Sequence, residues 1–124
     1  MVERGREPLK GYWSLPGGVL ETGESLGHGI EREVLEETGL IVQAEDIAKV
    51  FERIMRDSEG RAEYHYVLID YFCKVTGGSL QPGDDCSNVQ WFRISDLPQL
   101  LLTEGTLGVI EEAYETHQRR SARI

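Results

Sequence analysis

Residues 18–40, GVLETGESLGHGIEREVLEETGL, carry the most informative pattern in the chain. Within this stretch Ser25–Thr38 is predicted to form a helix, because apolar residues recur every four positions on one face, at Leu26, Ile30 and Val34. Ser25 is a residue type that caps helix N-termini, and Gly39 supplies the left-handed conformation that ends many helices. The pattern therefore predicts one amphipathic helix with both ends marked.

Three glutamates, Glu33, Glu36 and Glu37, share one face of this predicted helix, because they are related by i, i+3 and i, i+4 spacing. Such a cluster is either a solvated acidic surface or a site for a hard cation such as Mg²⁺, which prefers carboxylate oxygens. Two features favour the cation site. The helix has an apolar face that can pack on other elements. It also follows the pair Gly17–Gly18, whose main chain can come close to the helix because glycine has no side chain.

The remaining segments predict mostly strands. Gly11–Pro16 is a short aromatic stretch before the glycine pair. Leu40–Val42 and Ala48–Met55 are predicted as two strands, followed by a turn at Asp57–Gly60. Tyr64–Val75 is the strongest strand signal, and its nearly continuous apolar character predicts a central strand buried on both faces.

Towards the C-terminus, Val89–Ile94 is predicted as a strand and Ser95–Leu101 as a short helix. A last helix is expected from Thr106, as its cap, through His117. Its inward residues are expected to be Leu107, Ile110, Ala113 and Tyr114. Strands separated by one early helix and closed by another predict an α/β fold, with a mixed sheet between helical layers.

Composition limits the classes of function. The length of 124 residues suits one domain, residues 1–124. The net charge of −9 argues against a nucleic acid polymer as partner, because a basic footprint is missing. No membrane-spanning run or apolar signal core is visible, so a cytoplasmic protein is expected.

The stretch 18–40 resembles the Nudix box: Gly, five residues, Glu, seven residues, Arg-Glu-aliphatic, one residue, Glu-Glu, one residue, Gly-aliphatic. The matching positions are Gly18, Glu24, Arg32, Glu33, Val34, Glu36, Glu37, Gly39 and Leu40. The segments WSLPGG, YHYVLIDYF and WFRISDLP resemble the family's usual accompaniments in the same order. The resemblance covers nearly the whole chain and implies the Nudix fold.

The resemblance also implies roles for the box residues. Glu33, Glu36 and Glu37 would hold Mg²⁺, with Mn²⁺ as a substitute, and the carbonyl of Gly18 would be a further ligand. One of these carboxylates, with Glu33 the first choice, would orient or deprotonate the attacking water. The three glutamates would therefore carry catalysis as well as metal binding.

In the same family pattern, Glu24 and Arg32 form an ion pair that supports the site by fixing the loop against the helix. Family members often add an acidic ligand from a loop outside the helix. Asp84 and Asp85 are the candidates for this role here. A simple Pro-Gly-Asp-Asp turn explains the same residues equally well.

Three weaker candidates concern substrate binding, and Asp85 of the same acidic loop is the first of them. Trp13 could stack on a base, although an aromatic residue in a short strand is more often part of the core. Arg4 forms a basic cluster with Arg6 and Lys10 and could attract a phosphate. Exposed basic side chains near a terminus are more often only solvated.

The family normally has a strand before the segment that corresponds to Val2–Glu7, and this sequence lacks most of it. Loss of that strand would leave a neighbouring strand edge exposed. Because an exposed edge invites pairing, a homodimer is expected.

The resemblance implies an enzyme that hydrolyses a diphosphate linkage in a small nucleotide. ADP-ribose or a nucleotide sugar is favoured, because the stretch from His65 to Thr106 resembles bacterial ADP-ribose pyrophosphatases. The alternative is a house-cleaning hydrolase of modified nucleoside triphosphates such as 8-oxo-dGTP. A non-catalytic nucleotide-binding module is a third reading, and the complete set of clustered acids argues against it.

Overall fold

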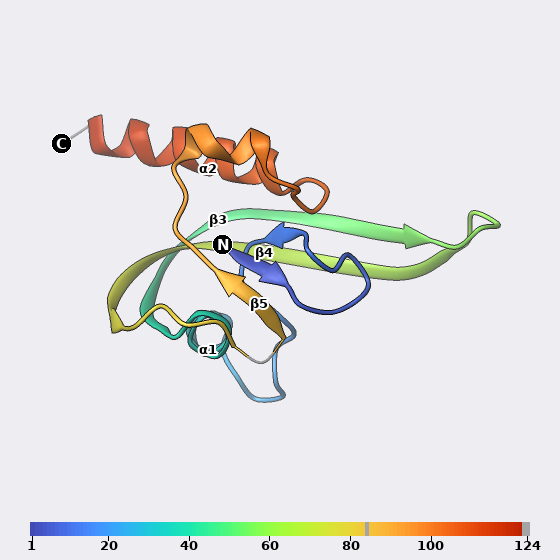
Figure 1. Ribbon diagram of the computed structural model, residues 1–124, viewed down its shortest axis with the longest axis horizontal. Helices are drawn as coiled ribbons and strands as arrows, with labels where there is room; N and C mark the ends of the chain where they lie inside the picture. The colour runs from blue at the N-terminus through green and yellow to red at the C-terminus, as the bar shows by residue number, and fades with distance from the viewer. Residues whose placement is uncertain (84, 123–124) are drawn as a thin grey trace.

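The computed structural model describes residues 1–83 and 85–122, which form strands between two helical layers. Figure 1 shows α2 on one side of the strands and α1 on the other, so the predicted α/β arrangement is confirmed. The elements are β1 (Val2–Arg4), β2 (Trp13–Ser14), α1 (Leu26–Thr38), β3 (Leu40–Arg56), β4 (Ala62–Gly78), β5 (Cys86–Val89), the 3₁₀ helix η1 (Ile94–Gln99) and α2 (Thr106–Ala122).

The strands form two sheets, one with the order β2-β1-β5 and one with the order β3-β4. The paired strands within each sheet are antiparallel. A parallel bridge between Trp13 and Leu102 adds a segment from the C-terminal half to the edge of β2. The first sheet thus joins the N-terminal segment to parts of the C-terminal half of the chain.

Helix α1 has both of the predicted caps. The side chain of Ser25 accepts a hydrogen bond from the backbone N–H of His28, and Gly39 ends the helix with a φ of 75°. The N–H of Gly39 donates to the carbonyl of Leu35. An added Cβ at Gly39 would collide with the carbonyl oxygen of Ser79, so the position needs glycine for space as well as for conformation.

The two strands predicted after α1 are one strand, β3, of 17 residues. Its pairing with β4 shifts register between Ala44 and Ile47 and again before Lys49. Irregularities of this kind let a strand bend without ending the ladder. The residues left between the two predicted strands are thus part of β3 and contain these irregularities.

The prediction that Tyr64–Val75 forms a central strand buried on both faces is wrong. Within the described residues β4 pairs only with β3, and 65% of Val67 and 52% of Tyr64 are exposed. Aromatic and β-branched composition indicates a strand but does not reveal what will pack on it. The outer halves of β3 and β4 form an arm that projects from the body (Figure 1).

Three predictions for the C-terminal half also need correction. Strand β5 covers Cys86–Val89, so it ends where the predicted strand was to begin. Helix α2 continues to Ala122 and includes Thr106 as its first residue. Its buried apolar residue is Val109, whereas 44% of Tyr114 is exposed. The predicted inward face is thus correct at Ile110, which lines the pocket in the core, and wrong at Tyr114.

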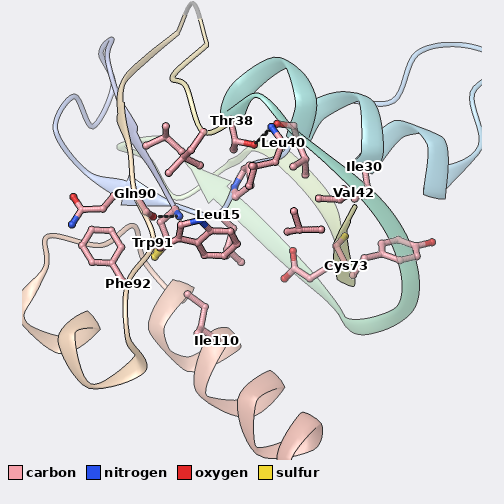
Figure 2. Close-up of a pocket in the computed structure, with 18 of the residues that line it drawn as sticks. Leu15, Ile30, Thr38, Leu40, Val42, Cys73, Gln90, Trp91, Phe92 and Ile110 are labelled. Carbon is pink, nitrogen blue, oxygen red and sulfur yellow. Dashed lines mark hydrogen bonds between the residues drawn. The ribbon is translucent and has the colours of Figure 1, made fainter. Parts of the chain in front are cut away.

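The core surrounds an apolar cavity of about 340 Å³ between α1, α2 and the strands. Figure 2 shows Ile30, Val42 and Ile110 around this space, with Cys73 on the β4 side. None of the side chains in the described residues is fully buried. A pocket therefore reaches into the core between the helical layers. In the described part of the chain, no helix is both long enough and apolar enough to cross a membrane.

Candidate active site

The glycine pair after β2 lies directly against the acidic face of α1. The backbone N–H of Gly17 donates a hydrogen bond to Oε2 of Glu37 at 2.8 Å. A Cβ added to Gly18 would lie 2.5 Å from Oε1 of Glu33. No real Cβ makes so close a contact, so the chain approaches Glu33 this closely only because residue 18 is glycine.

Arg32 joins the loop to the helix through four partners. Its Nε and Nη2 donate to the two carboxylate oxygens of Glu24 at 2.6 and 2.9 Å. Its Nη1 donates to Glu33 at 3.0 Å and to Glu36 at 3.1 Å. Nη2 also donates to the carbonyl of Val19 at 3.3 Å. The fork of the guanidinium group thus fixes the loop and two of the three clustered glutamates at once.

The ion pair strongly affects the acidity of Glu24. The hydrogen bonds from Arg32 are the largest cause that lowers its pKa, to about 2, and the backbone N–H of Glu21 also contributes. Only 13% of the Glu24 side chain is exposed, so little water competes for its oxygens. Glu24 is therefore ionised throughout the neutral range and holds Arg32 in place.

This shift predicts how acid will affect stability. A pKa depressed on folding stabilises the folded state above the ordinary value of 4.5, and the stabilisation is lost as the pH falls towards about 2. We expect Glu24→Gln to lower the urea midpoint most above pH 4.5, with the gap to wild type closing below that pH. Urea titrations with chelator at a series of pH values measure the gap. A gap that stays constant down to pH 2 would contradict the assigned cause.

Glu37 differs from Glu24 in the direction of its shift. Burial is the largest cause that raises its pKa, and the charges of Glu33, Asp85 and Glu36 raise it further. The hydrogen bond from the N–H of Gly17 opposes these effects without cancelling them. The group is thus held in a negative environment that a positive charge would relieve.

The segment after β4 wraps the C-terminal end of α1 and brings Asp85 near the site. The N–H of Gly83 donates to the carbonyl of Glu37 at 3.0 Å, and a Cβ at Gly83 would collide with the carbonyl oxygen of Glu36. Two residues later, the carboxylate of Asp85 lies 3.2 Å from Nε of Arg6. The negative charge of Asp85 also raises the pKa of Glu37. The other acidic candidate, Asp84, lies outside the described residues.

The clustered carboxylates do not converge on one point as they stand. In residues 1–83 and 85–122, no three acidic, histidine or cysteine side chains are placed to hold a metal ion together. Two of the three glutamates instead share Arg32, whose Nη1 donates to both Glu33 and Glu36. The available ligand atoms nevertheless suit a hard divalent cation, because they are carboxylate oxygens next to the main chain of the glycine turn. Glu36 is 57% exposed, so its carboxylate can turn to a cation once it leaves Nη1 of Arg32.

Of the weaker substrate candidates, Trp13 and Arg4 have other roles in the structure. Trp13 is only 8% exposed and packs edge-on against Phe92, with ring centroids 5.0 Å apart. It is a core residue and presents no face to a base. Arg4 donates from Nε to the carbonyl of Pro8 at 2.8 Å, which fixes the loop between β1 and β2.

Two residues of the site were not predicted in these roles. Gly17 contributes its backbone N–H to Glu37, and Arg6 pairs with Asp85 beside the acidic cluster. A signal existed for the first, because the glycine pair precedes the box. For Arg6 the sequence showed only that the residue belongs to a basic cluster. Its ion pair was not predictable, because the partner Asp85 lies 79 positions away in the chain.

Together, the fold and the site define an α/β protein in which the acidic face of helix α1 lies against a glycine turn. The sequence matches the NUDIX domain family over residues 1–113. The chain belongs to the Nudix hydrolase family.

Three known proteins illustrate the similarity. The chain is 36% identical over 100 residues to an ADP-ribose pyrophosphatase of Methanocaldococcus jannaschii, covering 81% of this chain and 57% of the relative. It resembles a crystal structure of UDP-X diphosphatase with a TM-score of 0.67 and 30% identity, over 86% of this chain and 52% of the other. It also resembles the NUDIX domain of Shewanella oneidensis NrtR complexed with ADP ribose, with a TM-score of 0.74 and 26% identity, over 93% and 74%. The chain thus spans little more than half of the curated relative.

Proposed function

We propose that this protein hydrolyses the diphosphate linkage of a small nucleotide with the help of a divalent cation. ADP-ribose or a nucleotide sugar is the favoured substrate class. The observation that carries the proposal is the acidic face of α1, where Glu33 and Glu37 meet the turn at Gly17–Gly18 and Glu36 shares Nη1 of Arg32 with Glu33. The three glutamates provide oxygen ligands for a cation. The neighbouring glycine turn has no side chains, so phosphate oxygens can come close to the cluster.

The residues of the acidic cluster have different roles in this proposal. Glu36 and Glu37, with Glu33 and the carbonyl of Gly18, would hold Mg²⁺, for which Mn²⁺ could substitute. The bound cation would supply positive charge against the diphosphate and make the attacking water more acidic. Glu33 would accept the proton of that water and aim it at one phosphorus atom. The bond from that phosphorus to the bridging oxygen then breaks, and the bridging oxygen leaves with the other phosphate.

Arg32 has a positioning role in this proposal. It holds Glu33 and Glu36 from one side, so a cation that gathers these carboxylates must compete with the guanidinium group. Because Glu24 retains both Nε and Nη2 of Arg32, the loop stays fixed when Nη1 is released. Activity would therefore not require the loop to rearrange.

Charge also favours a small substrate bridged by cations. The net charge of −9 repels a nucleic acid polymer. Near the cluster, Arg6 is 74% exposed and pairs with the equally exposed Asp85, so it can turn to the outer phosphate of a diphosphate. The similarity to an ADP-ribose pyrophosphatase and to a UDP-X diphosphatase supports the same substrate class.

A nucleotide panel tests the proposal. Purified protein is incubated with ADP-ribose, nucleotide sugars, dinucleoside polyphosphates, and normal and oxidised nucleoside triphosphates, with Mg²⁺ or with chelator. We expect Mg²⁺-dependent turnover of ADP-ribose or a nucleotide sugar well above the other classes. A preference for 8-oxo-dGTP would instead establish the house-cleaning alternative. Binding without turnover by folded protein would identify a nucleotide-binding module and reject the proposal.

A further inference from the structure

A pocket of about 270 Å³ lies between the loop after Gly18, helix α1 and strand β4. Gly18 and Glu33 are among the residues that line it, so the pocket adjoins the carboxylate cluster. Its volume is slightly below the range of roughly 300–1,000 Å³ that is typical of small-molecule sites. The pocket can therefore take one part of a nucleotide next to the reacting phosphates, but not the whole molecule.

The walls of this pocket are mainly apolar and unusually exposed. On the loop side, 81% of Val19 and 45% of Leu20 are exposed, and on the β4 side 65% of Val67 is exposed. Exposed apolar side chains that face one another often mark a binding site. A phosphate or a sugar with many hydroxyl groups gains little from such walls, whereas the faces of a flat heteroaromatic ring gain from contact with them.

Strand β4 adds hydrogen-bonding groups to these apolar walls. Residues 66–69 and 71 of β4 line the pocket, and within the described residues this strand has a partner on one side only. Along such an edge, alternate residues point their N–H and C=O groups away from the partner strand. A base offers a matching edge, because adenine carries an amino donor beside a ring-nitrogen acceptor.

We propose that this pocket binds the base of the nucleotide substrate, with the ring between the Val19–Leu20 loop and Val67 and its edge along β4. The inference rests on the proposed function for its substrate class. It adds the site that recognises the base. The phosphates then extend past Glu33 to the acidic cluster, and the side of the substrate that carries no base lies beyond the site, toward Arg6.

The test uses a Val67→Trp variant, in which a larger side chain fills the pocket from an exposed position. Met55→Trp is the matched control: Met55 lies on the same arm and is 47% exposed. It pairs with Tyr64, and neither Met55 nor Tyr64 is among the described residues that line the pocket. Val19→Trp, at an 81% exposed position of the facing wall, is the second blocking variant in case the first does not fold.

Binding of adenosine, measured by ligand-observed NMR in chelator, separates this inference from the proposed function, because it needs neither metal nor hydrolysis. We expect wild type and Met55→Trp to bind adenosine in the roughly millimolar range, and the two blocking variants to bind at least tenfold more weakly. With ADP-ribose and Mg²⁺, the blocking variants should raise KM more than they lower kcat. Absence of adenosine binding by wild type, or equal binding by blocking variants and control, would overturn the inference even if hydrolysis is found.

Discussion

In the Glu37→Gln variant, kcat for the preferred nucleotide is expected to fall by about a thousandfold or more. Glutamine keeps the size of the side chain and can still accept the hydrogen bond from the N–H of Gly17. It removes the negative charge that would hold a cation, and such cations contribute several kcal/mol to phosphate transition states. Steady-state kinetics at saturating Mg²⁺ measure the loss. Glu115→Gln, on α2 in the opposite layer, is the control and should retain wild-type activity.

The same substitution should not destabilise the protein. Burial raises the pKa of Glu37, so its ionisation is less favourable in the folded state than in the unfolded chain. Stability is therefore highest below the ordinary pKa and declines as the pH rises through the folded-state value. At neutral pH in chelator, the Tm of Glu37→Gln is expected to equal or exceed that of wild type. A lower Tm with a matching loss of activity would show that the residue is structural and that the catalytic role is wrong.

The second large effect is expected for Gly18→Ala. The new Cβ would lie 2.5 Å from the carboxylate oxygen of Glu33, so either the carboxylate or the loop must move. A displacement of about 1 Å at a catalytic group can cost a hundredfold in rate. We expect kcat to fall by about that factor.

Gly17→Ala is the neighbouring control for this effect. A Cβ at Gly17 meets nothing within 4 Å, and the backbone N–H that donates to Glu37 is kept. This variant should lose less than about threefold in kcat, since no group of the site has to move. Equal losses in the two variants would indicate a general effect of stiffening the glycine turn, and would contradict the assigned clash with Glu33.

The parts of the fold that local signals control were predictable from the sequence. The ends of α1 follow from Ser25 and Gly39, because a side-chain cap and a left-handed glycine act within a few residues. Helical spacing likewise placed Glu33, Glu36 and Glu37 on one face. The Glu24–Arg32 contact was expected only from the family pattern, and its two short hydrogen bonds are present in the structure.

Features that depend on distant contacts were not predictable in the same way. The composition of β4 identified a strand but not its exposure, because burial depends on which element packs against each face. Trp13 was equally ambiguous until Phe92, far along the chain, was found against it. The bridge that Arg32 makes to both Glu33 and Glu36 also needed side-chain geometry, since spacing alone predicts only that these acids repel one another.

The most direct test of the central claim is a ³¹P NMR time course of ADP-ribose with wild-type protein. The account predicts that Mg²⁺ starts the loss of the diphosphate signals and the appearance of two phosphomonoester signals, that excess chelator stops it, and that Glu37→Gln leaves the diphosphate intact. Diphosphate signals that persist with folded wild-type protein and Mg²⁺, or that disappear equally fast in chelator, would contradict a metal-dependent hydrolase acting through the glutamates of α1.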